Sequence, residues 1–205
     1  MAGAGTVGAR AAALAAGLWV GAAFGAAAQP FEAAGLSFSA ELGGITILDV
    51  WGRGTPQDPV TVVEEMTDPR GGVLTIRGLT AAFPNLVGTG HQSGFVLRKV
   101  VRNATRREWL TFELELRHEP GVPSDYGDGL SFGQEPGGGR PFTSDLLGEH
   151  TKLFEPHDRV AFGGGKVAPG ETVWFEVTIT HSWATGRDVL VIQEPDPRLA
   201  RLDLD

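Results

Sequence analysis

The sequence predicts an all-β fold, an antiparallel β-sandwich or jelly roll of about nine strands that follows a cleaved signal peptide. Short apolar or alternating runs recur along the chain, and Gly, Pro, Asn or Asp closes each of them. The 205 residues include 30 Gly and 13 Pro, which favours many turns over long helices. No long stretch has the periodicity of an amphipathic helix. Without an internal repeat or a long linker, residues 29–205 are expected to form a single domain.

Nine segments have the composition expected of strands, and residues 29–35 form a short lead-in to them. The expected strands are residues 36–42, 45–51, 60–66, 73–77, 94–102, 109–118, 159–162, 172–181 and 188–193. Gly43-Gly44 predicts a hairpin between the first two strands, and the three glycines at 163–165 predict another hairpin connection. Residues 81–92 and 120–156 are expected to be loops. The second loop contains a short apolar segment at 130–132 and one or two helical turns within 143–153.

Two strands show the alternation of buried and solvent-facing residues most clearly. In residues 109–118, we expect the buried row to consist of Leu110, Phe112, Leu114 and Leu116. In residues 172–181, we expect it to consist of Val173, Phe175, Val177 and Ile179. Strands with one buried face and one solvent-exposed face are typical of antiparallel sheets. The alternation places Trp109 and Trp174 on the faces that point away from the aliphatic rows.

The first 28 residues differ from the rest of the chain. Arg10 is their one charged side chain, residues 11–24 are uncharged and mostly apolar, and Ala26-Ala27-Ala28 supplies small residues for a signal peptidase. This order predicts a secretory signal that is cut between Ala28 and Gln29. The apolar stretch is too short and too rich in Ala and Gly for a membrane span of about 20 residues. An Ala-rich leader without that role is the alternative.

The charge balance narrows the possible partners. Removal of residues 1–28 takes the net charge from −8 to −9, because Arg10 leaves with them. An acidic protein is a poor nucleic-acid binder, since phosphates require a basic face. It also lacks a polybasic patch for anionic lipids. We therefore expect a secreted or periplasmic protein with no integral membrane segment in the mature chain, and the composition suits a GC-rich bacterial genome.

No set of residues in the sequence predicts catalysis. The chain has no Cys, which excludes disulfides and thiol chemistry. Residues 129–133 match the G-x-S-x-G pattern around a nucleophilic Ser131, but the glycine-rich residues that follow cannot begin the helix this motif requires. The five His show neither the helical i, i+4 spacing nor the H-x-H spacing of common zinc sites. We therefore expect that the protein is not an enzyme.

Two weaker ligand hypotheses come from the loops and the aromatic residues. Calcium prefers several oxygen ligands from a bendable loop, and the candidates for such a metal site are Asp125, Asp128, Asp145 and Glu149. Turn formation explains the same Asp and Gly residues equally well. Sugar rings stack on exposed indoles, and the candidates for that role are Trp109, Trp174 and Trp183. Burial under a second layer is the alternative for these rings.

Two stretches resemble a known group of exported modules. The first comprises Lys99-Val100-Val101-Arg102-Asn103-Ala104-Thr105 with Trp109 and Phe112-Glu113-Leu114-Glu115-Leu116. The second comprises Asp128-Gly129-Leu130-Ser131-Phe132, Asp158-Arg159-Val160-Ala161-Phe162 and Gly164-Gly165-Lys166-Val167-Ala168-Pro169-Gly170-Glu171-Thr172. Together they are similar to β-sandwich modules of PEP-CTERM-type surface proteins of Gram-negative bacteria. The resemblance implies an exported β-sandwich and carries no catalytic residues.

The C-terminal end departs from those surface proteins. Their sorting signal is a Pro-Glu-Pro motif, an apolar helix and basic residues, whereas no apolar span follows Glu194-Pro195-Asp196-Pro197 here. We therefore expect an unanchored product. The leading hypothesis is an exported, non-enzymatic protein with a structural, adhesive or extracellular-matrix role, whose partner is a glycan or another surface protein. A carbohydrate-binding module, with or without calcium, and an unrecognised hydrolase are the alternatives.

Overall fold

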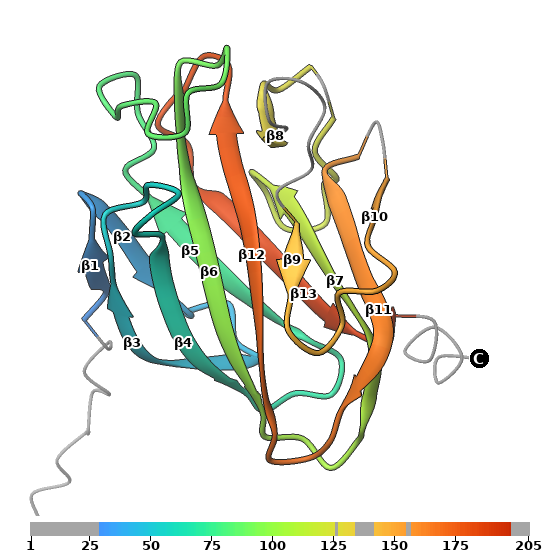
Figure 1. Cartoon of the computed structure of the whole chain (residues 1–205). Coiled ribbons are helices and arrows are strands. Elements are labelled where there is room, and N and C mark those ends of the chain that lie inside the picture. Colours follow the sequence, from blue (N-terminus) through green and yellow to red (C-terminus); the bar gives the residue numbers. More distant parts are fainter. Residues whose placement is uncertain (1–28, 126, 134–141, 155–156, 198–205) are drawn as a thin grey trace, which may run out of the picture.

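The structure is a computed structural model that describes residues 29–125, 127–133, 142–154 and 157–197. The predicted signal peptide lies outside these residues. Thirteen strands make up the regular structure of the described part of the chain (Figure 1). They are β1 (Phe31–Ala33), β2 (Leu36–Ser39), β3 (Ile45–Trp51), β4 (Val60–Met66), β5 (Gly72–Arg77), β6 (Ser93–Asn103), β7 (Trp109–Arg117), β8 (Leu130–Phe132), β9 (Thr143–Ser144), β10 (Lys152–Phe154), β11 (Arg159–Val167), β12 (Thr172–His181) and β13 (Val189–Pro195).

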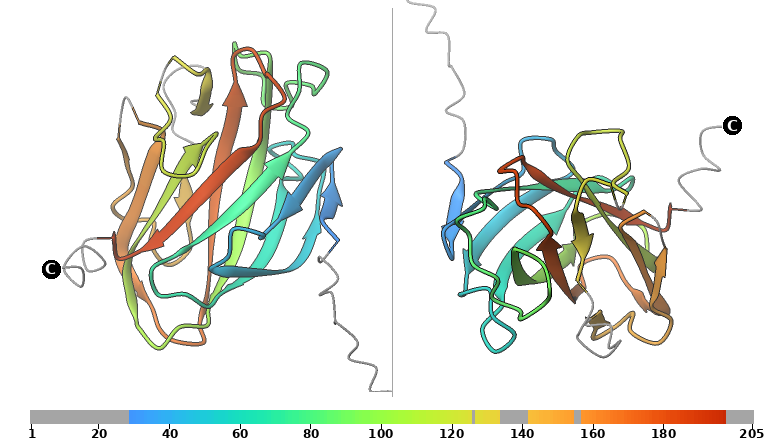
Figure 2. Two further views of the ribbon diagram at one scale, coloured as in Figure 1. Left: turned by 180° about the vertical axis from the view of Figure 1, so that it is seen from behind. Right: turned by 90° about the horizontal axis from the view of Figure 1, so that it is seen from above.

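The strands form two sheets that pack face to face, which confirms the predicted all-β sandwich (Figure 2). A seven-stranded sheet has the order β1-β2-β5-β13-β7-β11-β10. The second sheet has the order β3-β4-β6-β12-β8, and the short β9 also pairs with β12. The neighbouring strands in these orders run antiparallel except β4 and β6, which run parallel. In Figure 1, β6 and β12 pass in front of β13, which belongs to the other sheet.

The core fills the space between the sheets with the inward residues of each strand. Phe112 of β7 stacks on Phe175 of β12 across the two layers, with ring centroids 4.5 Å apart. Phe162 of β11 lies 4.9 Å from the same Phe175 ring. The buried rows of β12 are those that the alternation predicts, because each second residue from Val173 to Ile179 is inaccessible to solvent. Burial of this apolar surface is the main contribution that favours the fold.

Several predicted boundaries agree with the structure, and several elements were missed. β3, β4 and β12 span the predicted residues. β1 lies within the segment that was predicted as a lead-in, and the helical turns predicted within residues 143–153 are wrong, since β9 and β10 occupy that region. These three strands have two or three residues each, and strands of that length leave almost no alternation to read.

The hairpin predicted at Gly43-Gly44 is wrong. β2 belongs to the seven-stranded sheet and β3 to the other sheet, so the two glycines carry the chain between layers. Gly43 and Gly44 have φ values of +86° and +82°, a region that residues with a Cβ avoid. A Cβ on Gly44 would lie 2.1 Å from the carbonyl oxygen of Gly71. The glycine pair therefore permits a close backbone approach that the sequence pattern did not reveal.

The predicted orientation at the start of β7 is also wrong. Trp109 is 1% exposed and lies in the core, whereas Leu110 is 53% exposed. β11 continues through the glycines at 163–165, where a hairpin was predicted, and its register with β7 shifts between Gly163 and Val167. This bulge turns both Leu110 and Thr111 outward. Asp196 holds the bulge, because its Oδ1 accepts hydrogen bonds from the backbone N–H groups of Leu110 and Thr111 at 2.8 Å each.

Within the residues that the structure describes, no helix is long and apolar enough to cross a membrane.

Candidate functional site

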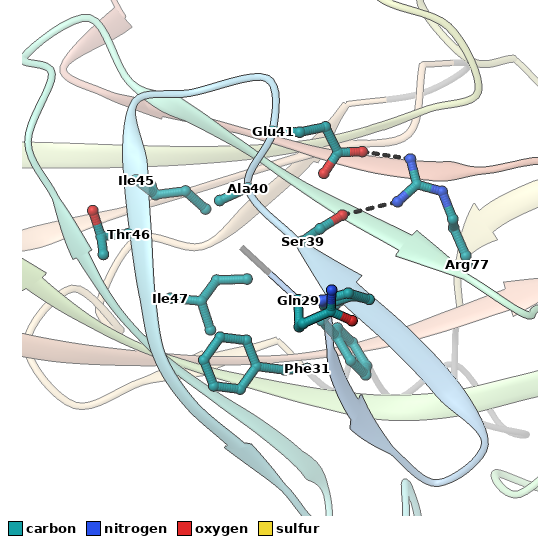
Figure 3. Close-up of a pocket in the computed structure, with 11 residues that line it drawn as sticks. Gln29, Phe31, Ser39, Ala40, Glu41, Ile45, Thr46, Ile47 and Arg77 are labelled. Atoms are coloured by element: carbon teal, nitrogen blue, oxygen red, sulfur yellow. Dashed lines mark hydrogen bonds and ion pairs between the residues drawn. The ribbon is translucent and has the colours of Figure 1, made fainter. Parts of the chain in front are cut away.

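A pocket of about 590 Å³ lies where the edge strands of the two sheets separate (Figure 3). One wall comes from the β1–β2 hairpin and the segment after it, and the facing wall comes from β3. The apolar part of the lining consists mainly of Phe31, Phe38, Ala40, Ile45 and Ile47. In Figure 3, Phe31 and Ile47 approach each other from opposite walls. The pocket therefore offers an apolar surface contributed by both sheets.

One end of this pocket is polar, and hydrogen bonds and ion pairs of Arg77 hold its side chains in place. Arg77 of β5 donates from Nη1 to the hydroxyl of Ser39 at 2.9 Å and from Nε to Asp188 at 3.0 Å, and its Nη2 contacts Glu41. Burial acts to raise the pKa of Glu41, but hydrogen bonds from Ser39 and Arg77 outweigh it and lower that pKa to about 2. Glu41 is therefore ionised at neutral pH. These contacts fix the position of the pocket's polar end.

Exposed apolar side chains lie on the edge strand beside the pocket. Leu48 and Trp51 of β3 are 51% and 49% exposed, and neither lines the pocket. The pairing of β3 with β4 shifts between Ile47 and Asp49, which is an irregularity of the kind that turns side chains outward. Edge strands present unpaired backbone groups and are common places for contact with another molecule. The pocket and this strand thus occupy the same side of the sandwich.

The three tryptophan candidates do not share a face. Trp109 lies in the core, so its ring offers no platform to a sugar. Trp174 is half-buried on the outer face of its sheet, and the guanidinium of Arg98 lies 5.4 Å from its ring centroid. Trp183 follows β12 and is 56% exposed. A Cβ on Gly129 would lie 2.9 Å from the Trp183 ring, so the indole lies directly against that glycine.

Three of the four candidate metal ligands accept hydrogen bonds from backbone N–H groups. Asp125 accepts from the N–H of Gly127 at 2.8 Å, and Asp128 accepts from the N–H of Leu130 at 2.9 Å. Asp145 accepts from the N–H of Trp174 at 2.9 Å, which ties β9 to β12. Glu149 lies next to Gly164. Among the described residues, no three His, Asp or Glu side chains are grouped so that they could hold a metal ion.

Ser131, the residue of the G-x-S-x-G match, lies in β8 and pairs with Thr180 of β12. Its hydroxyl lies 3.3 Å from the hydroxyl of Thr180. The Nδ1 of His91 lies 2.8 Å from the same Thr180 hydroxyl, so the serine and this imidazole share one partner and are not paired directly by these contacts. Ser131 is part of a regular strand and not of the sharp strand-to-helix turn that exposes a nucleophile.

Two buried histidines lie side by side at the end of the sandwich core. The sequence patterns did not predict that they are neighbours. His118 follows β7 and His181 ends β12, and their ring centroids are 5.3 Å apart. The Nδ1 of His118 lies 2.9 Å from the carbonyl oxygen of Asp188, to which it must donate. The Nδ1 of His181 accepts from the N–H of Trp183 at 3.3 Å. Both Nε2 atoms are buried and have no hydrogen-bond partner among the described residues.

The chain matches no known protein family, no curated protein and no solved structure. The pocket and the histidine pair therefore have to be interpreted from their own geometry. Sequence reasoning missed both sites because each joins strands of different sheets. The alternation in residues 172–181 did place His181 on the same side as Val177 and Ile179, and that was the one signal in the sequence for a buried histidine.

Proposed function

We propose that the protein is an exported, non-enzymatic β-sandwich that works by binding, in an adhesive or extracellular-matrix role. The pocket between β1–β2 and β3 is the observation that carries this proposal. Its volume of about 590 Å³ lies within the range of about 300–1,000 Å³ that small-ligand sites occupy. Such sites are mostly apolar with a few fixed polar groups, which is the composition of this lining.

The exposed β3 edge supports the adhesive part of the proposal. Leu48 and Trp51 present apolar surface beside the pocket, where an apolar group of a partner can insert while the rest of the partner contacts the strand. Tryptophan is enriched at the centres of protein interfaces. A partner that uses both features would bury more surface than the pocket alone provides.

The pocket can be tested with N-phenyl-1-naphthylamine, an uncharged fluorescent probe whose emission rises in apolar sites. The protein should enhance its fluorescence saturably. Ala40→Phe should weaken binding about tenfold or more, because the added ring occupies pocket volume that the probe needs. Ile47→Asp, which places a charge in the opposite wall, should weaken binding as well. Leu48→Ser is the matched control, since it removes an exposed apolar residue of the same strand outside the pocket.

Failure of the probe to bind would contradict the pocket-based proposal. Equal binding by the Leu48→Ser and Ala40→Phe proteins would also contradict it, because the probe would then be detecting surface hydrophobicity and not the pocket.

Export is a separate part of the proposal and has its own test. Fractionation of cells that express the full chain should find the protein outside the cytoplasm. Its intact mass should correspond to a chain that begins at Gln29. A cytoplasmic protein that retains residues 1–28 would contradict the export proposal without affecting the pocket.

Glycan binding at Trp183 is a second candidate function, and the exposure of its ring against Gly129 favours it. Stacking on an exposed indole does not require a deep pocket. A glycan that raises the melting temperature of the protein, and fails to do so after Trp183→Ala, would support this candidate. An unchanged melting temperature across a glycan panel would leave the pocket as the site to pursue.

A further inference from the structure

The turn that carries Trp183 is attached to the sandwich through His181. The N–H of Trp183 donates to Nδ1 of His181 at 3.3 Å, and the preceding N–H, of Ser182, donates to the carbonyl oxygen of Gly129 at 2.7 Å. The indole itself lies against Gly129. One of the contacts that hold this exposed aromatic side chain is thus made by a titratable group.

These contacts define the proton positions on the two histidines. Because Nδ1 of His181 accepts a hydrogen bond, its neutral ring carries the proton on Nε2. His118 is the opposite tautomer, since its Nδ1 donates to the carbonyl of Asp188 and leaves Nε2 without a proton. The next proton to bind His181 therefore enters at Nδ1, the atom that faces the N–H of Trp183.

We propose that His181 is an acid-sensitive switch, in which protonation of Nδ1 breaks the hydrogen bond from Trp183 and releases the turn that presents this indole. The proton comes from solvent, and the ring becomes an imidazolium with an N–H at both nitrogens. Two N–H donors then face each other at Nδ1, so the former contact becomes repulsive.

The groups around His181 determine where this change occurs on the pH scale. Burial lowers the pKa of His181 from 6.5, and the neighbouring His118 lowers it further. Asp128, in the loop before β8, acts in the opposite direction. His91, before β6, and Arg187, before β13, add smaller lowering effects. The turn is therefore attached at neutral pH, and we expect its release at a pH below 6.5.

Burial makes a positive charge on His181 costly. His181 is 1% exposed and lies opposite Ser93 of β6, a residue that is also inaccessible. The Nε2 of His181 and the Nε2 of His118 have no hydrogen-bond partner among the described residues, so no hydrogen bond at Nε2 stabilises a charge on the His181 ring. Relief comes most directly from opening the end of the sandwich, where Trp183 already faces solvent.

Amide hydrogen exchange of Trp183, measured from pH 8 to pH 4.5 and corrected for the intrinsic pH dependence, tests the proposal. The corrected rate should rise about tenfold across the transition, which corresponds to loss of one hydrogen bond. His181→Gln keeps an acceptor that does not titrate, so the transition should disappear. His91→Gln is the matched control, because this neighbour is more exposed, and the transition should remain.

Two charge variants make the test specific. Asp128→Asn removes the group that favours the charged ring, so the midpoint should move to lower pH. His118→Gln removes a group that opposes it, so the midpoint should move to higher pH. A transition that persists in His181→Gln would overturn the proposal, as would midpoints that do not move in these opposite directions. A corrected rate that stays constant from pH 8 to pH 4.5 would overturn it too.

Discussion

The ion pair between Lys99 of β6 and Glu64 of β4 places two opposite charges in the core of the sandwich. Both side chains are 0% exposed, and Nζ of Lys99 lies 2.8 Å from Oε2 of Glu64. The second carboxylate oxygen, Oε1, has no partner among the described residues. Burial lowers the pKa of Lys99, and the adjacent Glu64 opposes that effect. The pair is thus held together inside an environment that disfavours each charge separately.

Removal of one partner should be costly. Lys99→Met keeps most of the aliphatic side chain and deletes the charge, which leaves Glu64 buried and uncompensated. Loss of one member of a buried pair costs about 3–5 kcal/mol. A domain is stabilised by only about 5–15 kcal/mol, so this variant should unfold at a much lower denaturant concentration. The double variant Lys99→Met/Glu64→Leu should recover most of the loss, because well-packed apolar replacements are often neutral or stabilising.

Guanidinium chloride denaturation with linear extrapolation measures these free energies of unfolding. The surface pair between Arg70 and Asp68 is the matched control, since the Arg70 side chain is 81% exposed. Arg70→Met should change stability by about 1 kcal/mol or less. The reasoning is refuted if Lys99→Met costs no more than Arg70→Met. It is also refuted if the double variant loses as much as the two single variants added together.

Three further predictions concern the pH response, the β7 bulge and calcium. Folding lowers the pKa of His181, so its contribution to stability is complete above pH 6.5 and is lost as the pH falls through the lowered pKa. Thermal stability should therefore fall less between pH 7 and pH 5 in His181→Gln than in the wild type. Asp196→Ala should cost about 1–3 kcal/mol in denaturation experiments, since its carboxylate accepts from two backbone N–H groups, and a loss below 0.5 kcal/mol would contradict its role in the bulge. Calcium and EDTA should give the same melting temperature, because Asp125, Asp128 and Asp145 already accept backbone hydrogen bonds, and a calcium-dependent rise would restore the metal hypothesis.

The sequence was sufficient for features that depend on neighbours along the chain. The alternation in β12 identified both its span and its buried row, because antiparallel strands with one wet face have a period of two residues. The same reasoning failed at Trp109, where the cause is the carboxylate of Asp196, more than 80 residues away in the chain. It failed at Gly44 for a similar reason, since the contact that requires a glycine is made by Gly71.

The candidate sites could not be predicted from the sequence, because each is formed by strands of two different sheets. Phe31 lies in a three-residue strand that shows no pattern, and it meets Ile47 only after the chain has crossed from one layer to the other. His118 and His181 are more than 60 residues apart, and neither has a spacing that marks a site. Of the three tryptophan candidates, Trp183 is the most exposed.

The proposal that the protein binds ligands at its open edge is tested most directly by a ¹H–¹⁵N NMR titration with N-phenyl-1-naphthylamine. We predict saturable shifts that are confined to amides of β1, β2, β3 and Arg77, and their loss in Ala40→Phe. Shifts centred on Trp183, or no saturable shifts at any amide, would contradict the assignment of the pocket as the binding site.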